Sequence, residues 1–86
     1  MVSFAIELYW PGMEEGSVRE LVDKLKRDLA SMDPTAIGFL GCTVSPRDEI
    51  CFLRVEADAE WRVAELVKRL ELGRPRISEM VDLHVE

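Results

Sequence analysis

The chain has 86 residues, 48% hydrophobic and 33% charged, which predicts one small globular domain over residues 1–86 rather than a disordered chain. Seventeen acidic against eleven basic side chains give a net charge of −6, which argues against nucleic acids and anionic membranes as partners. No apolar run reaches the ~20 residues of a membrane helix, and the start lacks the features of a signal peptide. We therefore expect a cytoplasmic protein in a reducing environment.

Residues 2–10 alternate between two kinds of side chain, which predicts a strand with one fully apolar face. The apolar series is Val2, Phe4, Ile6, Leu8 and Trp10, and the mixed series is Ser3, Ala5, Glu7 and Tyr9. Ser17 and Glu20 form a capping-box pattern, so a helix is expected to begin near Ser17. Apolar residues at spacings of three and four continue this helix to Met32, and Asp33-Pro34 ends it.

Residues 37–45 and 50–57 are rich in β-forming residues and flank a turn, which predicts a hairpin. The face covered by helices is expected to hold Leu40, Cys42, Val44, Cys51, Leu53, Val55 and Ala57, with Phe39 on the opposite face. A two-residue Pro46-Arg47 loop needs positive φ, which proline forbids, so a loop from Pro46 to Glu49 is favoured. That loop places Cys51 opposite Val44. Glycines 38 and 41 indicate a bulge or a close backbone approach.

Cys42 and Cys51 allow three interpretations: two free thiols, a disulfide, or part of a zinc site. A reducing compartment favours free thiols. Their facing or diagonal placement leaves a disulfide open, because disulfide geometry is demanding. A single histidine and the absence of a second cysteine pair argue against zinc.

Residues 59–71 have the apolar spacing of a second helix, with Asp58 as N-cap, Gly73 as the residue after the C-cap, and Pro75 preventing continuation. Residues 76–86 alternate again and predict a last strand. The order strand, helix, strand, strand, helix, strand predicts an α+β domain of the ferredoxin-like βαββαβ type. Such a domain has a four-stranded antiparallel sheet with two helices on one face.

The uncovered face of that sheet is expected to combine apolar and charged side chains. Its predicted residues are Ala5, Glu7, Tyr9, Phe39, Thr43, Ile50, Phe52, Arg54, Glu56, Met80, Asp82 and His84. This set is too apolar to face water and too charged for a dry core, so we expect a homodimer through this face with a partly polar cavity. Trp61, opposite the apolar stripe of the second helix, either folds over the rim or joins an interface.

Several of these residues are candidates for chemistry. His84, the one histidine, is a candidate general base that Asp82 would orient, and Arg54 is a candidate anion ligand unless Glu7 or Glu56 neutralises it. The sequence contains no dinucleotide-binding fingerprint, phosphate-binding loop, zinc-protease motif or nucleophile elbow.

The segments "ELYWPG", "FLGCTVSPRDEICFLRVEA" and "LGRPRISEMVDLHVE" resemble a family of short bacterial proteins of ferredoxin-like fold. Most of its members have unknown function, and one branch is nickel-binding. The resemblance implies a dimeric α/β-barrel-like assembly. The first strand of the nickel-binding branch ends in paired histidines, whereas Tyr9 and Trp10 stand here, so we expect no metal. Two His84 side chains across a two-fold axis, aided by Asp82, are the one metal site left open, and we expect no cofactor.

Our leading hypothesis is a homodimeric module that binds a small organic or anionic ligand in a pocket on the uncovered face. The residues assigned to this pocket are Glu7, Tyr9, Phe52, Arg54 and His84. A second hypothesis is a cofactor-free oxygenase, isomerase or cyclase of the same architecture, in which Glu7 or His84 moves a proton. A nickel-binding protein and a purely structural interaction module are two further hypotheses. The sequence does not decide whether a reaction is catalysed.

Overall fold

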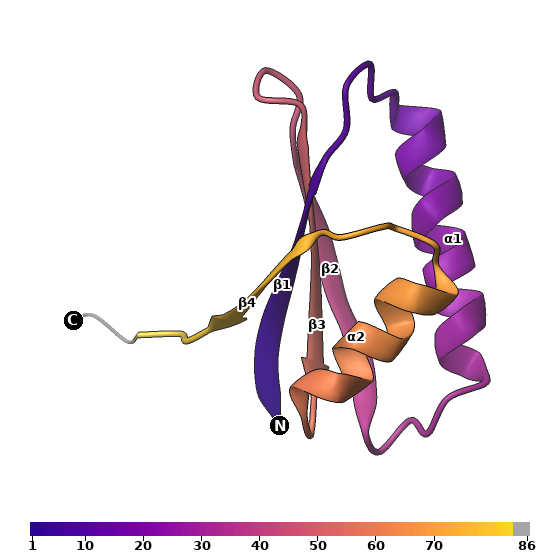
Figure 1. Cartoon of the computed structure of the whole chain (residues 1–86), viewed down its shortest axis with the longest axis vertical. Coiled ribbons are helices and arrows are strands. Elements are labelled where there is room, and N and C mark those ends of the chain that lie inside the picture. Colours follow the sequence, from indigo (N-terminus) through magenta and orange to yellow (C-terminus); the bar gives the residue numbers. More distant parts are fainter. Residues whose placement is uncertain (84–86) are drawn as a thin grey trace.

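The computed structural model describes residues 1–83, which form a four-stranded antiparallel sheet with two helices on one face (Figure 1). The elements are β1 (Val2–Tyr9), α1 (Glu15–Ala30), β2 (Ile37–Ser45), β3 (Ile50–Ala57), α2 (Glu60–Arg69) and β4 (Arg76–Met80). The strand order is β2-β3-β1-β4, so β2 and β4 are the two edges. This confirms the predicted ferredoxin-like α+β fold. No helix among the described residues is long and apolar enough to cross a membrane.

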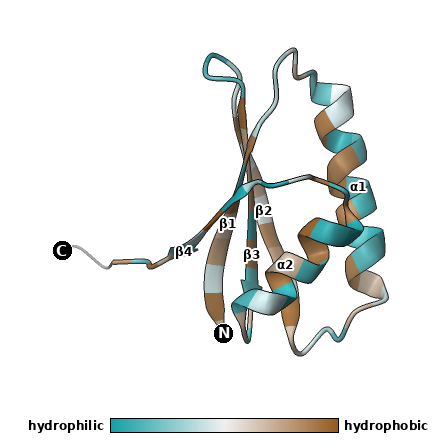
Figure 2. Ribbon diagram, in the orientation of Figure 1, coloured by the Kyte–Doolittle hydropathy of each residue, from teal (hydrophilic) through white to brown (hydrophobic). Residues whose placement is uncertain are grey.

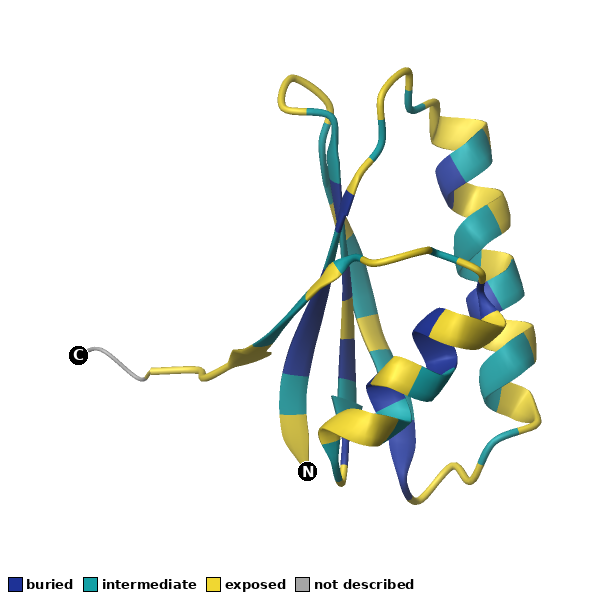
Figure 3. Ribbon diagram, viewed as in Figure 1, coloured by how far each residue is buried: buried dark blue, intermediate teal, exposed yellow. Residues whose placement is uncertain are grey.

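The core lies between the sheet and the two helices (Figures 2 and 3). Alternate residues of the central strands are buried there, as the alternation predicted, except Val2 at the start of β1. They are Phe4, Ile6 and Leu8 in β1, and Cys51, Leu53, Val55 and Ala57 in β3. The helices contribute Val18, Leu25, Val63, Leu66 and Val67, and Leu70 adds to the core from the C-cap of α2. A fully buried aliphatic side chain stabilises the fold by about 1.5–3 kcal/mol, so this layer is the main source of stability.

The hairpin between β2 and β3 has the predicted four-residue loop, because Val44 pairs with Cys51 and Ser45 with Ile50. Within the loop, the Ser45 hydroxyl donates to Asp48 at 2.9 Å. Glu49 has a positive φ of 57° and joins the hairpin to the segment that follows β1. Its carboxylate accepts a hydrogen bond from the Gly12 amide at 2.8 Å, and its carbonyl accepts one from the Trp10 amide at 2.7 Å.

The prediction that Phe39 lies on the uncovered face and Leu40 on the covered face is wrong, because β2 contains a bulge. Phe39 pairs with Val55 and packs against the core, so it lies on the helix-covered face. Leu40 is the inserted residue and is 45% exposed. One extra residue reverses the alternation, and beyond it Cys42 pairs with Leu53 on the covered face as predicted.

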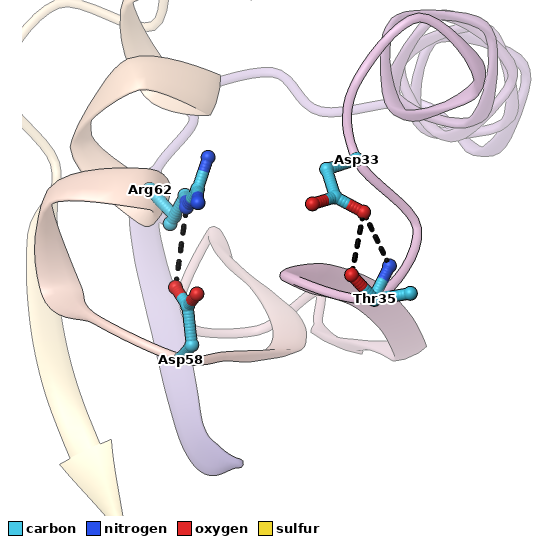
Figure 4. A network of polar contacts seen from close by, with 4 residues as sticks. All are labelled: Asp33, Thr35, Asp58 and Arg62. Carbon is cyan, nitrogen blue, oxygen red and sulfur yellow. Dashed lines mark hydrogen bonds and ion pairs between the residues drawn. The ribbon is translucent and has the colours of Figure 1, made fainter.

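The first helix begins two residues earlier than predicted. Its N-cap is Glu14, which makes no side-chain capping bond, and the predicted cap Ser17 therefore lies inside the first turn. The helix ends at Ala30, where the Ser31 hydroxyl donates to the carbonyl of Asp28 at 2.8 Å. Asp33 then starts a turn by accepting hydrogen bonds from the amide and hydroxyl of Thr35, at 2.9 and 2.6 Å (Figure 4).

The second helix also differs at both ends. Ala59, not Asp58, is its N-cap, and the Asp58 carboxylate instead pairs with Arg62 at 3.2 Å (Figure 4). At the other end, the positive-φ position after the C-cap is Glu71, with φ 54°, rather than Gly73. The amides of Glu71 and Leu72 bond the carbonyls of Lys68 and Val67, at 3.1 and 3.3 Å. These two bonds form a Schellman motif.

The last strand is shorter than predicted. It ends at Met80, because its pairing with β1 ends where Ser3 faces Met80. Residues 81–83 leave the sheet and point away from the helices (Figure 1). The rest of the predicted strand, residues 84–86, lies outside the described residues.

Candidate functional site

The face of the sheet without helices, called here the open face, is defined by the register of the four strands. Residues that alternate with the core residues of each strand point to it. It holds Gly38, Gly41, Thr43 and Ser45 of β2; Ile50, Phe52, Arg54 and Glu56 of β3; Ser3, Ala5, Glu7 and Tyr9 of β1; and Arg76, Ser78 and Met80 of β4.

Four of the five predicted ligand-binding residues lie together on this face. Glu7 of β1 pairs with Phe52 of β3, and the next row toward the start of β1 pairs Ala5 with Arg54. Tyr9 lies one row in the other direction and is 72% exposed. The alternation of β1 and β3 brings these side chains side by side, because neither strand contains a bulge in their pairing.

The fifth predicted residue, His84, lies outside the described residues. Asp82, which was expected to orient it, follows the end of β4 and is exposed. Within residues 1–83 no group of three or more histidine, cysteine or acidic side chains is placed to hold a metal ion.

The Arg54 side chain extends over the backbone of Gly41 on the neighbouring strand. A Cβ at Gly41 would lie 2.5 Å from Nη2 of Arg54, so any other residue there would displace the guanidinium. This is the close approach that the glycines of β2 indicated. The sequence left open whether Glu7 or Glu56 neutralises Arg54, and Arg54 forms no ion pair within residues 1–83.

Arg76 is a site residue that the sequence analysis missed. It pairs with Glu7 across β1 and β4, so Glu7 lies between Phe52 on one side and Arg76 on the other. The signal was present in the alternation of the last strand, which places Arg76 in phase with Ser78 and Met80. Like Arg54, Arg76 forms no ion pair in the part of the chain described.

The residues that the structure describes form a small hollow at one end of the sheet and a larger groove along its β2 edge. The smaller, about 310 Å³, lies where β1 ends and β4 begins, and includes Glu7 and Tyr9. Its other lining residues are Leu8, Leu72, Arg74, Pro75 and Arg76. The larger, about 710 Å³, is a groove between α1 and the edge strand β2. Phe52 and Arg54 line neither hollow and are presented by the open face itself.

The two cysteines are free thiols whose sulfur atoms are 3.7 Å apart, on diagonal positions of β2 and β3. Cys51 is fully buried, whereas Cys42 is half-buried and lines the groove beside α1. Burial first, and then the hydrogen bond and charge of Cys42, raise the pKa of Cys51 to about 12. Cys51 is therefore a neutral thiol at physiological pH and no nucleophile.

Trp61 lies on α2, away from the open face, and is 58% exposed. The guanidinium of Arg62 is 4.1 Å from its ring centroid, which is a cation–π contact. Trp61 is therefore not part of the candidate site.

The sequence matches no protein-family model and no curated protein. The candidate site consequently rests on geometry: an uncovered sheet face with Glu7, Tyr9, Phe52, Arg54 and Arg76 as neighbours.

Proposed function

We propose that the protein is a homodimer through the open face and that it binds a small organic anion between the two sheets. The observation that carries the proposal is the mixed character of this face. Phe52 and Ile50 are half-buried with no helix above them, and Tyr9 and Met80 are exposed at 72% and 49%. An exposed apolar area of this kind marks an interaction surface.

The charges of the open face support a second copy of the same chain as the partner. The whole chain carries a net charge of −6, which opposes self-association over most of its surface. The open face is balanced, because Arg54 and Arg76 stand against Glu7 and Glu56. In an interface with two-fold symmetry the same patch meets itself, so a balanced patch can be self-complementary.

The size of the face is sufficient for a dimer. Four strands about 4.8 Å apart, with up to nine residues at about 3.3 Å each, give the face an area on the order of 500 Å². Two such faces would bury roughly 1,000 Å², which is the lower limit for a specific interface. A chain of 86 residues has a thin hydrophobic core, so a partner subunit would also stabilise the fold by burying more apolar surface.

The ligand class follows from the side chains around Phe52. Arg54 and Arg76 offer guanidinium groups to a carboxylate, which they bind in a two-pronged geometry. Phe52 and Tyr9 offer aromatic surface to the remainder of the ligand. We therefore expect a small molecule with one carboxylate and an apolar body, of which benzoate is a simple example.

Benzoate titration of the purified protein, followed by amide NMR signals, tests the proposal. The amides of Glu7, Phe52 and Arg54 should shift together in a saturable manner. Arg54→Met should weaken benzoate binding about tenfold, because a charge-assisted hydrogen bond is lost. Arg47→Met is the matched control, since Arg47 lies in the hairpin loop away from the open face. Unshifted open-face signals, or equal binding by both variants, would contradict the assignment.

A further inference from the structure

The edge strand β2 carries a bulge but neither of the residue types, charged residues and prolines, that also protect an edge. Its sequence, IGFLGCTVS, contains neither a charged residue nor a proline over nine residues. Natural sheets shield such strands with charges or prolines, or cover them, because the unpaired backbone groups of an edge bind other strands. Beyond the bulge, the regular edge from Gly41 to Ser45 can therefore pair with another segment.

A groove runs beside this edge on the helix-covered side. Its volume is about 710 Å³. Apolar residues on it are Met13, Val18, Val22, Cys42, Val44 and Pro46. Charged residues of α1 complete the lining, and two of them, Arg19 and Glu15, pair with each other at 2.7 Å. The groove can accept apolar side chains from a strand that lies beside β2.

The chain itself supplies a segment with matching properties. Residues 81–83, called here the arm, continue β4 and project away from the body (Figures 1 and 3). Val81 and Leu83 are 74% and 80% exposed. They are two positions apart, so in an extended chain both side chains point to one side.

The phase of these residues along the sequence matches the groove. Val81 and Leu83 are in phase with Ile77, which pairs with buried Ile6 and so points to the helix-covered side. The groove beside β2 opens on the helix-covered side as well. An extended arm that paired with β2 and kept the phase of β4 would therefore direct Val81 and Leu83 to the helix-covered side, where the groove lies.

The arm cannot reach the groove of its own chain. In the order β2-β3-β1-β4, two strands separate β4 from β2, which is about 14 Å across the sheet. The arm also points away from the helices that form the groove (Figure 1). In a symmetric dimer, by contrast, each arm can cover the edge of the other copy, and both edges are covered by one operation.

We propose that the arm of one copy pairs with the β2 edge of a second copy and places Val81 and Leu83 in the groove between α1 and β2. This inference rests on the proposed homodimer and adds a second contact to the open-face interface. It also explains why a nine-residue edge strand carries no charge.

Cysteine trapping tests the placement, because Cys42 lines the groove. Val81→Cys and Leu83→Cys are made separately in a Cys51→Ala background, which removes the other thiol close to Cys42. Mild oxidation should give a disulfide-linked dimer with at least one of them, and Cys42→Ser should abolish it. Trp61→Cys, exposed on α2, is the control and should give no such link to Cys42.

A second measurement uses the otherwise native chain. Leu83→Asp should raise the dimer dissociation constant about tenfold or more, because a charge would enter an apolar groove. Trp61→Asp should leave that constant unchanged. A dimer by light scattering that neither cross-links through Cys42 nor responds to Leu83→Asp would overturn the arm placement alone. A disulfide between Cys42 and the arm of the same chain would show that the groove is filled by its own arm and not by a second copy. A monomeric native protein would overturn the proposed dimer as well.

Discussion

The guanidinium of Arg54 occupies the space that a side chain at Gly41 would need, with Nη2 2.5 Å from the position of a Cβ. Gly41 lies at the end of the β2 bulge and pairs with Arg54. The bulge and the glycine thus allow a long cationic side chain to lie flat on the open face, where we propose that it binds an anion.

Gly41→Ala should displace the Arg54 side chain and destabilise the fold. The backbone cost of alanine at Gly41 is the same whether or not Arg54 is present, so a double-mutant cycle with Arg54→Met isolates the contact. Urea unfolding should show that Gly41→Ala costs less in the Arg54→Met background, with a coupling of about 0.5 kcal/mol or more. Additive effects would show that the two residues do not touch.

The bulge predicts opposite behaviour for two adjacent residues. Phe39→Ala should lower the free energy of unfolding by about 2 kcal/mol or more, because Phe39 packs against the core. Leu40→Ala should cost less than about 0.5 kcal/mol, since Leu40 is the exposed inserted residue. Thermal or urea unfolding of both variants decides the register. A larger loss of stability for Leu40→Ala than for Phe39→Ala would indicate that β2 alternates regularly, without the bulge.

Glu71→Gly should stabilise the protein by about 0.5–1 kcal/mol. Glu71 has φ 54° in the Schellman motif that ends α2, a conformation that glycine adopts without the strain of a Cβ. Gly73→Ala is the opposite control and should destabilise, because Gly73 has φ 74°. Unfolding midpoints measured side by side check both. No gain from Glu71→Gly would argue against this helix end.

Asp33 should contribute a pH-dependent stability. Hydrogen bonds from the Thr35 hydroxyl, then from its amide, lower the pKa of Asp33 below its ordinary value of 3.8, and the charge of Arg62 adds a smaller effect (Figure 4). A carboxyl whose pKa is lower in the folded state stabilises the fold at pH values above its unfolded-state pKa. That stabilisation is lost as the pH falls through the folded-state pKa. Asp33→Asn should therefore be less stable than the parent at pH 7, and the difference should shrink below about pH 4. A difference that does not change with pH would exclude this linkage.

The fold was predictable from sequence because its central strands follow simple rules. In β1 and β3 a wholly apolar series of residues alternates with a series that contains both apolar and polar residues. The pairing of the two strands runs from Val2 to Tyr9 without interruption. That regularity was sufficient to bring Glu7, Phe52 and Arg54 together. It failed in β2, where one inserted residue, Leu40, moved Phe39 to the other face.

Helix ends were less predictable, since capping patterns are short and recur by chance. Ser17 and Glu20 match a capping box but lie within α1, and Asp58 pairs with Arg62 rather than capping α2. Arg76 was overlooked although its phase along β4 was readable. The groove beside α1 depends on how the helix sits over β2, which residue spacing alone does not specify.

The central claim is that the open face joins two copies of the chain. Light scattering coupled to size exclusion, at micromolar concentration, tests it most directly. We predict a particle of twice the 9.8 kDa chain mass for the native protein, and a single chain for Phe52→Asp, with Trp61→Asp remaining dimeric. A native particle of one chain mass, or a dimer that tolerates Phe52→Asp, would contradict the account.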